Sequence, residues 1–322
     1  MRNRDVCASK WSGWACIGFL TFAMAVSACG GQRGPRGETY TVKHDGLQRE
    51  YVLYTPQAGE EPRPLLIALH GGFGTGEKMQ GFTGFNSIAK EEGFVAVYPQ
   101  GIGRHWNDGR TGTDYEAHGD EVDDVGFITK LIEEVDSKTK IDRDRVYVTG
   151  ASNGGLMTQR LACEAADKFA AVASVIGSMA ANLKDRCDPG EPVPFLTIKG
   201  TEDDLVPYDG GTIDEDGKGR GEVLSTGEVL AFWRDNNGCK SSTTRTEIVD
   251  DLDDGSRVVV REYADGCPED EVILYRVEGG GHTWPGGTQY LPEIFVGKVS
   301  QEVDASEEIW DFFKTHGRED TQ

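Results

Sequence analysis

The sequence predicts an α/β fold in which a mostly parallel central sheet is flanked by helices. Three observations predict this class. Apolar runs of four to six residues recur along the chain, helical patterns lie between them, and glycine-rich or acidic loops follow several of the runs. An apolar run of this length without alternation is typical of a strand that is buried on both faces.

The elements can be placed in order along the chain. Each predicted strand is a short apolar run, and each predicted helix has an apolar face; the C-terminal helix also begins at Asp304, with Glu307 three residues later, like a capping box. The predicted strands are 65–69, 94–99, 146–149, 194–198, 257–260 and 272–277, and the predicted helices are 125–137, about 155–166, and 304–316.

The N-terminus has the pattern of an export signal. Three basic residues precede an apolar stretch at 14–26 that is short for a membrane span, and residues 26–30 resemble a bacterial lipobox with lipid attached to Cys29. We expect a signal peptide over 1–28, a tether over 29–37, one catalytic domain over 38–317 and a frayed tail over 318–322. An ordinary secretory signal is the alternative, so the protein is expected to be anchored to the cell envelope or secreted.

Charge and composition exclude some classes of partner. The chain of 322 residues has 33 basic and 55 acidic residues and a net charge of −22, which would repel nucleic acid. The acidic clusters at 214–217 and 250–255 lack the spacing of a calcium loop, and the second is predicted to be a hairpin turn. We expect no metal and no cofactor, and a membrane association only through the lipid.

Four cysteines follow the signal segment, an even number that suits an oxidising compartment. Three pairings are possible, and proximity in the sequence favours Cys163 with Cys187 and Cys239 with Cys267. None of the four has the spacing of a zinc site.

The stretch 150–154, Gly-Ala-Ser-Asn-Gly, follows a predicted strand and precedes a predicted helix. A G-x-S-x-G sequence in this context is typical of a nucleophile elbow, in which a sharp turn lifts the serine hydroxyl away from the backbone. Ser152 is therefore the predicted nucleophile.

Two further residues complete a predicted triad. Asp203 follows the strand at 194–198, and His282 lies in a glycine-rich loop after the strand at 272–277. The order Ser, Asp, His is that of α/β-hydrolases, with His282 as the general base and Asp203 as its orienting acid. Asp123 or Asp124 is the alternative acid, but either would precede the nucleophile. The histidines at 44, 105, 118 and 316 are expected to be structural or on the surface.

The loop 70–76, His-Gly-Gly-Phe-Gly-Thr-Gly, follows the strand at 65–69. It is similar to the turns that supply one N–H of an oxyanion hole, and we assign the two donors to the backbone of Gly72 and Asn153. A phosphate-binding loop would require Gly-Lys-Ser/Thr at its end, which this loop lacks.

Together these motifs resemble one family, the polyhydroxybutyrate depolymerase-like esterases, which include bacterial feruloyl and acetylxylan esterases. The matching segments are 70–72, 106–107, 122–127, 150–155, 203–208 and 280–286, within a resemblance over about 38–316. Family members often have histidine where this chain has Lys199, a change expected to be silent, and polymer-degrading members commonly have cysteine where Gly72 stands.

The resemblance implies an exported serine carboxylesterase, depolymerase-like, that forms an acyl-enzyme on an ester substrate. Feruloyl or acetylxylan ester hydrolysis is the alternative within this class. Trp106 and Trp284 are candidates to line the substrate pocket. We expect a monomer. A hypothesis from a different class is a lipoprotein that binds a ligand on an inactive hydrolase scaffold, against which the complete Ser152, Asp203 and His282 set argues.

Overall fold

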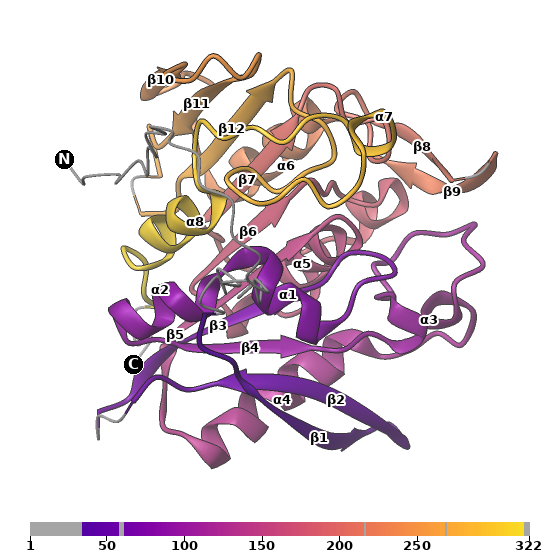
Figure 1. Cartoon of the computed structure of the whole chain (residues 1–322), viewed down its shortest axis with the longest axis vertical. Coiled ribbons are helices and arrows are strands. Elements are labelled where there is room, and N and C mark those ends of the chain that lie inside the picture. The colour runs from indigo at the N-terminus through magenta and orange to yellow at the C-terminus, as the bar shows by residue number, and fades with distance from the viewer. Residues whose placement is uncertain (1–33, 58–60, 216, 268, 319–322) are drawn as a thin grey trace, which may run out of the picture. The chain divides into compact units, whose positions relative to one another are not determined.

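The computed structural model describes residues 34–57, 61–215, 217–267 and 269–318. Within them the main sheet has ten strands in the order β1-β2-β4-β3-β5-β6-β7-β12-β11-β10 (Figure 1). The six strands from β4 to β12 in this order are parallel to one another, whereas β1, β2, β10 and β11 pair antiparallel at the two sides. A separate antiparallel pair consists of β8 and β9.

The strands have the following bounds: β1 Glu38–His44, β2 Leu47–Tyr54, β3 Arg63–Leu69, β4 Val95–Pro99, β5 Ile141–Ala151, β6 Ala171–Val175, β7 Phe195–Gly200, β8 Gly211–Glu215, β9 Lys218–Val223, β10 Arg245–Val249, β11 Arg257–Tyr263 and β12 Val272–Glu278. Every residue of β4, β6 and β7 is buried, as expected for strands covered on both faces.

Helices pack on both faces of the sheet and bury two apolar clusters. One cluster includes side chains of α4, α5 and α6, and the other includes side chains of α1, α2 and α8. This is the layered arrangement of an α/β domain. The helices are α1 Gly76–Thr83, α2 Phe85–Glu92, α3 Glu116–Gly119, α4 Asp124–Lys138, α5 Asn153–Glu164, α6 Thr226–Asn237, α7 Glu293–Val296 and α8 Ala305–Phe313.

The predicted fold class is confirmed, and every predicted strand and helix is present, although several boundaries differ. β5 begins at Ile141, five residues before the predicted strand. The prediction missed this first part of the strand because it is partly exposed and has no apolar run. The acidic segment 250–255 connects the antiparallel strands β10 and β11, as predicted. In that turn Asp254 accepts hydrogen bonds from Ser256 and from the backbone of Gln301.

The ends of the domain differ from expectation. Within the predicted tether, the Pro35 carbonyl accepts a hydrogen bond from Asn86 of α2, and the Gly37 N–H donates to Gln80 of α1. At the other end Arg318 was expected to be frayed, but its N–H donates to the Asp144 carbonyl and its guanidinium contacts Glu191. Cys29 and the signal segment lie outside the described residues. No helix of the described part is both long and apolar enough to cross a membrane.

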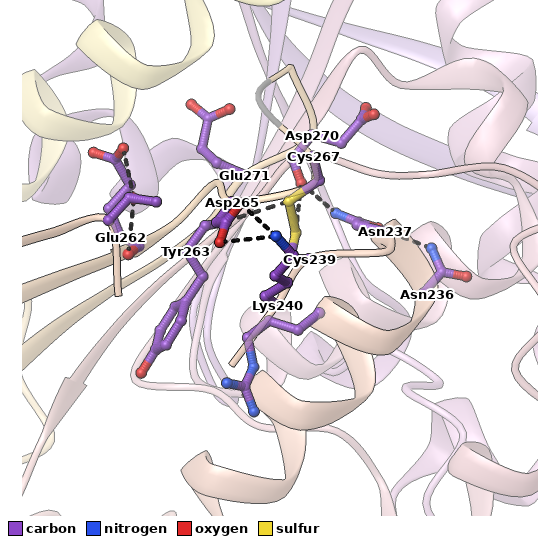
Figure 2. The surroundings of a disulfide bond; sticks show 12 residues. Asn236, Asn237, Cys239, Lys240, Glu262, Tyr263, Asp265, Cys267, Asp270 and Glu271 are labelled. Atoms are coloured by element: carbon purple, nitrogen blue, oxygen red, sulfur yellow. Dashed lines mark hydrogen bonds and ion pairs between the residues drawn. A yellow bond between two sulfur atoms is a disulfide. The ribbon is translucent and has the colours of Figure 1, made fainter. Parts of the chain in front are cut away.

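Both disulfides that the sequence favoured are present. Cys163 at the end of α5 is bonded to Cys187, and Cys239 after α6 is bonded to Cys267 before β12. Figure 2 shows that the second bridge lies beside the Lys240–Asp265 ion pair and beside Asn237, whose amide donates to the Asp270 carbonyl. This bridge therefore connects α6 to the loop between β11 and β12.

Candidate active site

Ser152 stands between β5 and α5 in a backbone conformation that non-glycine residues rarely adopt, with φ 55° and ψ −119°. Close packing enforces this turn. A Cβ at Gly154 would lie 2.4 Å from the Leu69 carbonyl oxygen, and a Cβ at Gly150 would lie 2.3 Å from the Gly154 oxygen. Glycine is therefore required on both sides of Ser152, as in a nucleophile elbow.

Three other loops meet the elbow at one edge of the sheet. β3, β5, β6, β7 and β12 are consecutive parallel neighbours, so their carboxyl ends lie on the same side. The loops that follow β3, β5, β7 and β12 carry Gly72, Ser152, Asp203 and His282 respectively. Residues that are distant in sequence are brought together in this way, as is usual for ligand sites in parallel sheets.

Asp203 and His282 are directly hydrogen-bonded. His282 Nδ1 lies 2.9 Å from each carboxylate oxygen of Asp203, and both side chains are buried. The backbone N–H groups of Leu205 and Val206 also donate to Asp203 Oδ1, at 3.1 and 2.9 Å. Burial alone would raise the pKa of Asp203, but the charge of His282, together with Lys199 and the hydrogen bonds, lowers it to about 2.

Lys199, a change that was expected to be silent, contacts the predicted acid of the triad. Its ammonium donates to Asp203 Oδ2 at 2.7 Å and also to the carbonyl oxygen of Val206. The side chain is 1% exposed. A lysine next to the carboxylate was visible in the sequence, but its contact with Asp203 depends on the turn after β7.

The loop that carries His282 is fixed by its neighbours. The His282 N–H donates to the Val296 carbonyl at 2.6 Å, and the Tyr290 hydroxyl donates to the His282 carbonyl at 3.0 Å. With Nδ1 bonded to Asp203, Nε2 is the ring nitrogen that remains for another partner. The imidazole orientation is therefore set before any substrate binds.

The loop after β3 is held by His70. The Gly101 N–H donates to His70 Nε2 at 3.0 Å, so Nδ1 carries the proton and donates to the Gly71 carbonyl at 2.8 Å. Burial lowers the pKa of His70 to about 4, which keeps the ring neutral. The next residue, Gly72, lies against Asn153, and a Cβ at Gly72 would be 4.0 Å from Asn153 Cβ.

Gly72 and Asn153 both line the pocket at Ser152. Among the described residues, neither backbone N–H donates to a backbone carbonyl. The Asn153 N–H is one of the unpaired donors at the start of α5, where the helix dipole favours negative charge. The structure thus brings the two predicted oxyanion donors to the same pocket.

The pocket is small, with a volume of about 40 Å³. Since a water molecule needs about 10 to 15 Å³ of such volume, the pocket holds about three. Its lining includes polar and aromatic residues as well as apolar ones. The lining residues are Gly72, His105, Arg110, Tyr115, Ser152, Asn153, Leu156, Leu205, Val206, Ile213 and His282.

The two tryptophans predicted as pocket residues are not among this lining. The Trp106 indole N–H donates to the His70 carbonyl at 2.9 Å, and the Trp284 indole N–H donates to Ser306 at 3.0 Å. Both rings are almost fully buried. They support the loops on which Gly72 and His282 lie.

Sequence reasoning missed most of the pocket walls. Leu205 and Val206 lie two and three residues after Asp203 and could have been proposed from that position alone. His105, which was expected to be structural or on the surface, lines the pocket and stacks on Tyr115 with ring centroids 3.7 Å apart. Ile213 belongs to the β8–β9 pair, for which the sequence carries no signal of proximity to the site.

The alternative acids lie elsewhere. Asp123 caps α4 and contacts His44 at 2.9 Å, and Asp124 forms a buried ion pair with Arg49 at 2.6 Å. Neither has a described contact with His282.

Comparison with known proteins shows similarity to esterases. A family model described as "Esterase PHB depolymerase" matches residues 49–185. "Putative esterase NocK" of Nocardia uniformis subsp. tsuyamanensis is 34% identical over 298 residues, which are 87% of this chain and 85% of that protein. Feruloyl esterase C of Emericella nidulans is 31% identical over 243 residues, which are 73% of this chain and 76% of that protein.

Among solved structures, the acetyl xylan esterase from Aspergillus awamori is similar with a TM-score of 0.59. The match covers 87% of this chain and all of that chain at 16% sequence identity. At this identity the likeness concerns the fold, which is that of α/β-hydrolase esterases.

Proposed function

Since this chain belongs to the polyhydroxybutyrate depolymerase family of esterases and is a carboxylic ester hydrolase, we propose that it cleaves its ester through an acyl-enzyme on Ser152. One observation carries the proposal. His282 Nδ1 is bonded to Asp203, and His282 and Ser152 line the same pocket. This arrangement provides a nucleophile, a base and a group that orients the base.

In the first half of the reaction, Ser152 Oγ attacks the ester carbonyl carbon while its proton passes to His282 Nε2. The N–H groups of Gly72 and Asn153 donate to the oxyanion, and each donor of this kind contributes roughly 3 kcal/mol to transition-state stabilisation. Asp203 stabilises the imidazolium. The C–O bond to the alcohol then breaks, and His282 returns the proton to the leaving oxygen.

In the second half, a water molecule loses a proton to His282 and attacks the acyl carbon. The bond to Ser152 Oγ breaks, the serine regains the proton, and the carboxylic acid leaves. No redox step or metal-bound nucleophile takes part in this sequence.

The substrate is proposed to be an oligomer of a hydroxyalkanoate polyester, with feruloylated or acetylated polysaccharide as the alternative. The apolar wall of Leu156, Val206 and Ile213 suits a short acyl chain. The aromatic wall of His105 and Tyr115 suits a planar acyl group or the alcohol portion of the ester.

The test is product release from a 3-hydroxybutyrate trimer, methyl ferulate and acetylated xylan by the natural chain, by Ser152→Ala and by the exposed control Ser137→Ala. We expect Ser152→Ala to lose at least about a thousandfold in kcat on every accepted ester and Ser137→Ala to lose none. Retention of full activity by Ser152→Ala would refute the acyl-enzyme. The preferred ester identifies the acyl group.

We further propose that the protein is an exported monomer, anchored by lipid on Cys29 or secreted. The two disulfides of the domain are consistent with an oxidising compartment. Cell fractionation of Cys29→Ser is the test: loss of the protein from the membrane fraction is expected, and its retention there would contradict lipidation.

A further inference from the structure

A buried lysine contacts the acid of the proposed triad. Lys199 is the fifth residue of β7, and its ammonium bridges Asp203 Oδ2 and the Val206 carbonyl. Asp203 Oδ1 meanwhile accepts from the N–H groups of Leu205 and Val206. Lys199 thus connects the end of the strand to both sides of the turn that presents the carboxylate.

We propose that Lys199 is a positioning residue of the active site: its ammonium holds the Asp203 carboxylate in place against His282, and its positive charge acts on the imidazole through that carboxylate. The proposal rests on the assignment of His282 as the base. It assigns to Lys199 an influence on the imidazole that is exerted through Asp203, because the lysine has no described contact with the imidazole or with Ser152.

The charges of the buried cluster give the physical reason. With His282 neutral, the negative charge of Asp203 is balanced by the ammonium of Lys199, and the buried group of three is neutral. Protonation of His282 then leaves one uncompensated positive charge in a buried site, which is costly. Without the lysine the same protonation would neutralise a buried negative charge, so it would occur at higher pH.

The lysine must be charged for this to hold, and its ion pair with the Asp203 carboxylate favours the ammonium. A neutral amine would leave the Asp203 carboxylate without a counter-ion whenever His282 is neutral. Burial is the largest influence and lowers the pKa of Lys199 below its usual value, and the charge of Asp203 and the hydrogen bond between them oppose this lowering. The carboxylate accepts four further hydrogen-bond contacts from His282, Leu205 and Val206, so it remains ionised.

Other titratable and charged groups lie around the cluster, but the hydrogen bonds and ion pairs described for the Asp203 carboxylate come from Lys199, His282 and the backbone of Leu205 and Val206. The Tyr290 hydroxyl bonds to the His282 carbonyl, and burial, with the charge of Asp203, raises its pKa to about 12. Glu202, Asp204 and Tyr208 are close to Asp203 in the sequence. Arg276 lies opposite Lys199 in β12 and is paired with Glu278. His105 and Arg110 line the pocket, and Arg110 is paired with Asp108.

The expected size of the effect follows from the geometry. Lys199 Nζ and His282 Nδ1 both contact Asp203 Oδ2, at 2.7 and 2.9 Å, so the two nitrogens are less than about 6 Å apart. A unit charge at that distance in a site of intermediate dielectric changes a proton equilibrium by about 1 to 2 pH units.

The experiment follows the titration of the His282 ring nitrogens by ¹⁵N NMR, which does not require turnover. The proteins are the natural chain, Lys199→Met and Lys199→Gln, where glutamine keeps a hydrogen-bond donor but removes the charge. We expect the midpoint to move upward by about 1 to 2 pH units in both variants. An unchanged or lower midpoint in either would overturn the proposal.

A matched control separates this effect from general destabilisation. Arg49→Met also removes a buried cation from a buried ion pair, with Asp124, outside the pocket lining. Its His282 midpoint is expected to be unchanged, and an equal shift would overturn the proposal. If the variants at Lys199 do not fold, the natural chain still decides, since a Lys199 ¹⁵Nζ resonance of a neutral amine in the range where His282 titrates would refute it.

The acid limb of kcat/KM gives the second readout. It is expected to move to higher pH in Lys199→Met and Lys199→Gln, so both variants lose activity first at low pH. The NMR titration is independent of the Ser152 test. An active Ser152→Ala enzyme would refute the acyl-enzyme, but the titration midpoints of His282 would still report on Lys199.

Discussion

The side-chain amide of Asn153 donates a 2.6 Å hydrogen bond to Asp108 Oδ2, and both residues are buried. The same amide group also bonds both backbone polar groups of Trp106, at 2.8 and 3.1 Å. Asp108 is a firm anchor: burial would raise its pKa, but Arg110 and His118 hold it below its usual range. The side chain of Asn153, the residue after the proposed nucleophile, is therefore hydrogen-bonded to the loop after β4, and Asn153 also lines the pocket.

This relationship predicts the effect of Asn153→Ala. The change leaves the Trp106 N–H and one Asp108 oxygen without their partner, which costs about 2 to 4 kcal/mol of unfolding free energy. It also frees the oxyanion donor, so kcat should fall about 10- to 100-fold. Asn237→Ala is the control, since the Asn237 side chain makes four hydrogen bonds, two of them buried, and is not part of the pocket lining. Denaturant unfolding and kinetics of both variants check this, and an equal loss of kcat in the two would contradict it.

Gly154→Ala is predicted to disrupt the elbow. The new Cβ would lie 2.4 and 2.6 Å from the carbonyl oxygens of Leu69 and His70, which are backbone atoms of the adjoining strand and loop. We expect a loss of at least about 3 kcal/mol in stability and at least a hundredfold in kcat/KM. Gly81→Ala serves as the control because that helical glycine of α1 has open space, where alanine should be neutral or slightly stabilising. Thermal unfolding and ester assays distinguish the two; a fully active Gly154→Ala enzyme would be incompatible with the described packing.

His70 is predicted to make stability depend on pH. Burial lowers its pKa from 6.5 to about 4, so below pH 6.5 the unfolded chain binds a proton that the folded protein excludes. The stabilisation is complete above pH 6.5 and is lost as the pH falls to about 4, a change of about 3 kcal/mol. Urea unfolding at several pH values measures this slope. His70→Asn keeps the donor to the Gly71 carbonyl without the titration, and an unchanged slope in this variant would assign the effect to another group.

Ile213→Ala is predicted to broaden the choice of acyl group. Ile213 is 3% exposed and closes one side of the pocket from the β8–β9 pair. Its truncation should raise kcat/KM for longer acyl chains relative to acetyl by about tenfold, since each methylene in such a pocket is worth about 1 to 3 kcal/mol. Val223→Ala removes volume from the same apolar cluster without reaching the pocket lining, and its chain-length profile should be unchanged. A series of p-nitrophenyl esters of increasing length provides the measurement.

The sheet and the positions of Ser152, Asp203 and His282 could be predicted because their signals are local. Each lies at the end of a short apolar strand, and parallel strands place such ends on one side of a sheet without further information. The order of the three residues along the chain favoured Asp203 as the acid over Asp123 and Asp124, because these two precede the nucleophile.

The pocket walls and the contact of Lys199 could not be predicted, because both depend on packing between distant segments. Ile213 reaches the site from a pair of strands outside the main sheet, and Tyr115 does so from a long loop. Trp106 and Trp284 follow the opposite pattern: their position beside motif residues suggested substrate contact, but their indole N–H groups are used inside the protein. Proximity in sequence does not determine which way a large side chain points.

The two disulfides have a consequence for how the chain responds to cleavage. The Cys163–Cys187 bond closes a ring of chain that contains the central strand β6, and the Cys239–Cys267 bond closes another that contains β10, β11 and the exposed acidic turn at 250–255. A protease that cuts within either ring produces two fragments that remain covalently joined. The exposed turn at 250–255 can thus be nicked while the strands on both sides of the cut stay connected to the domain.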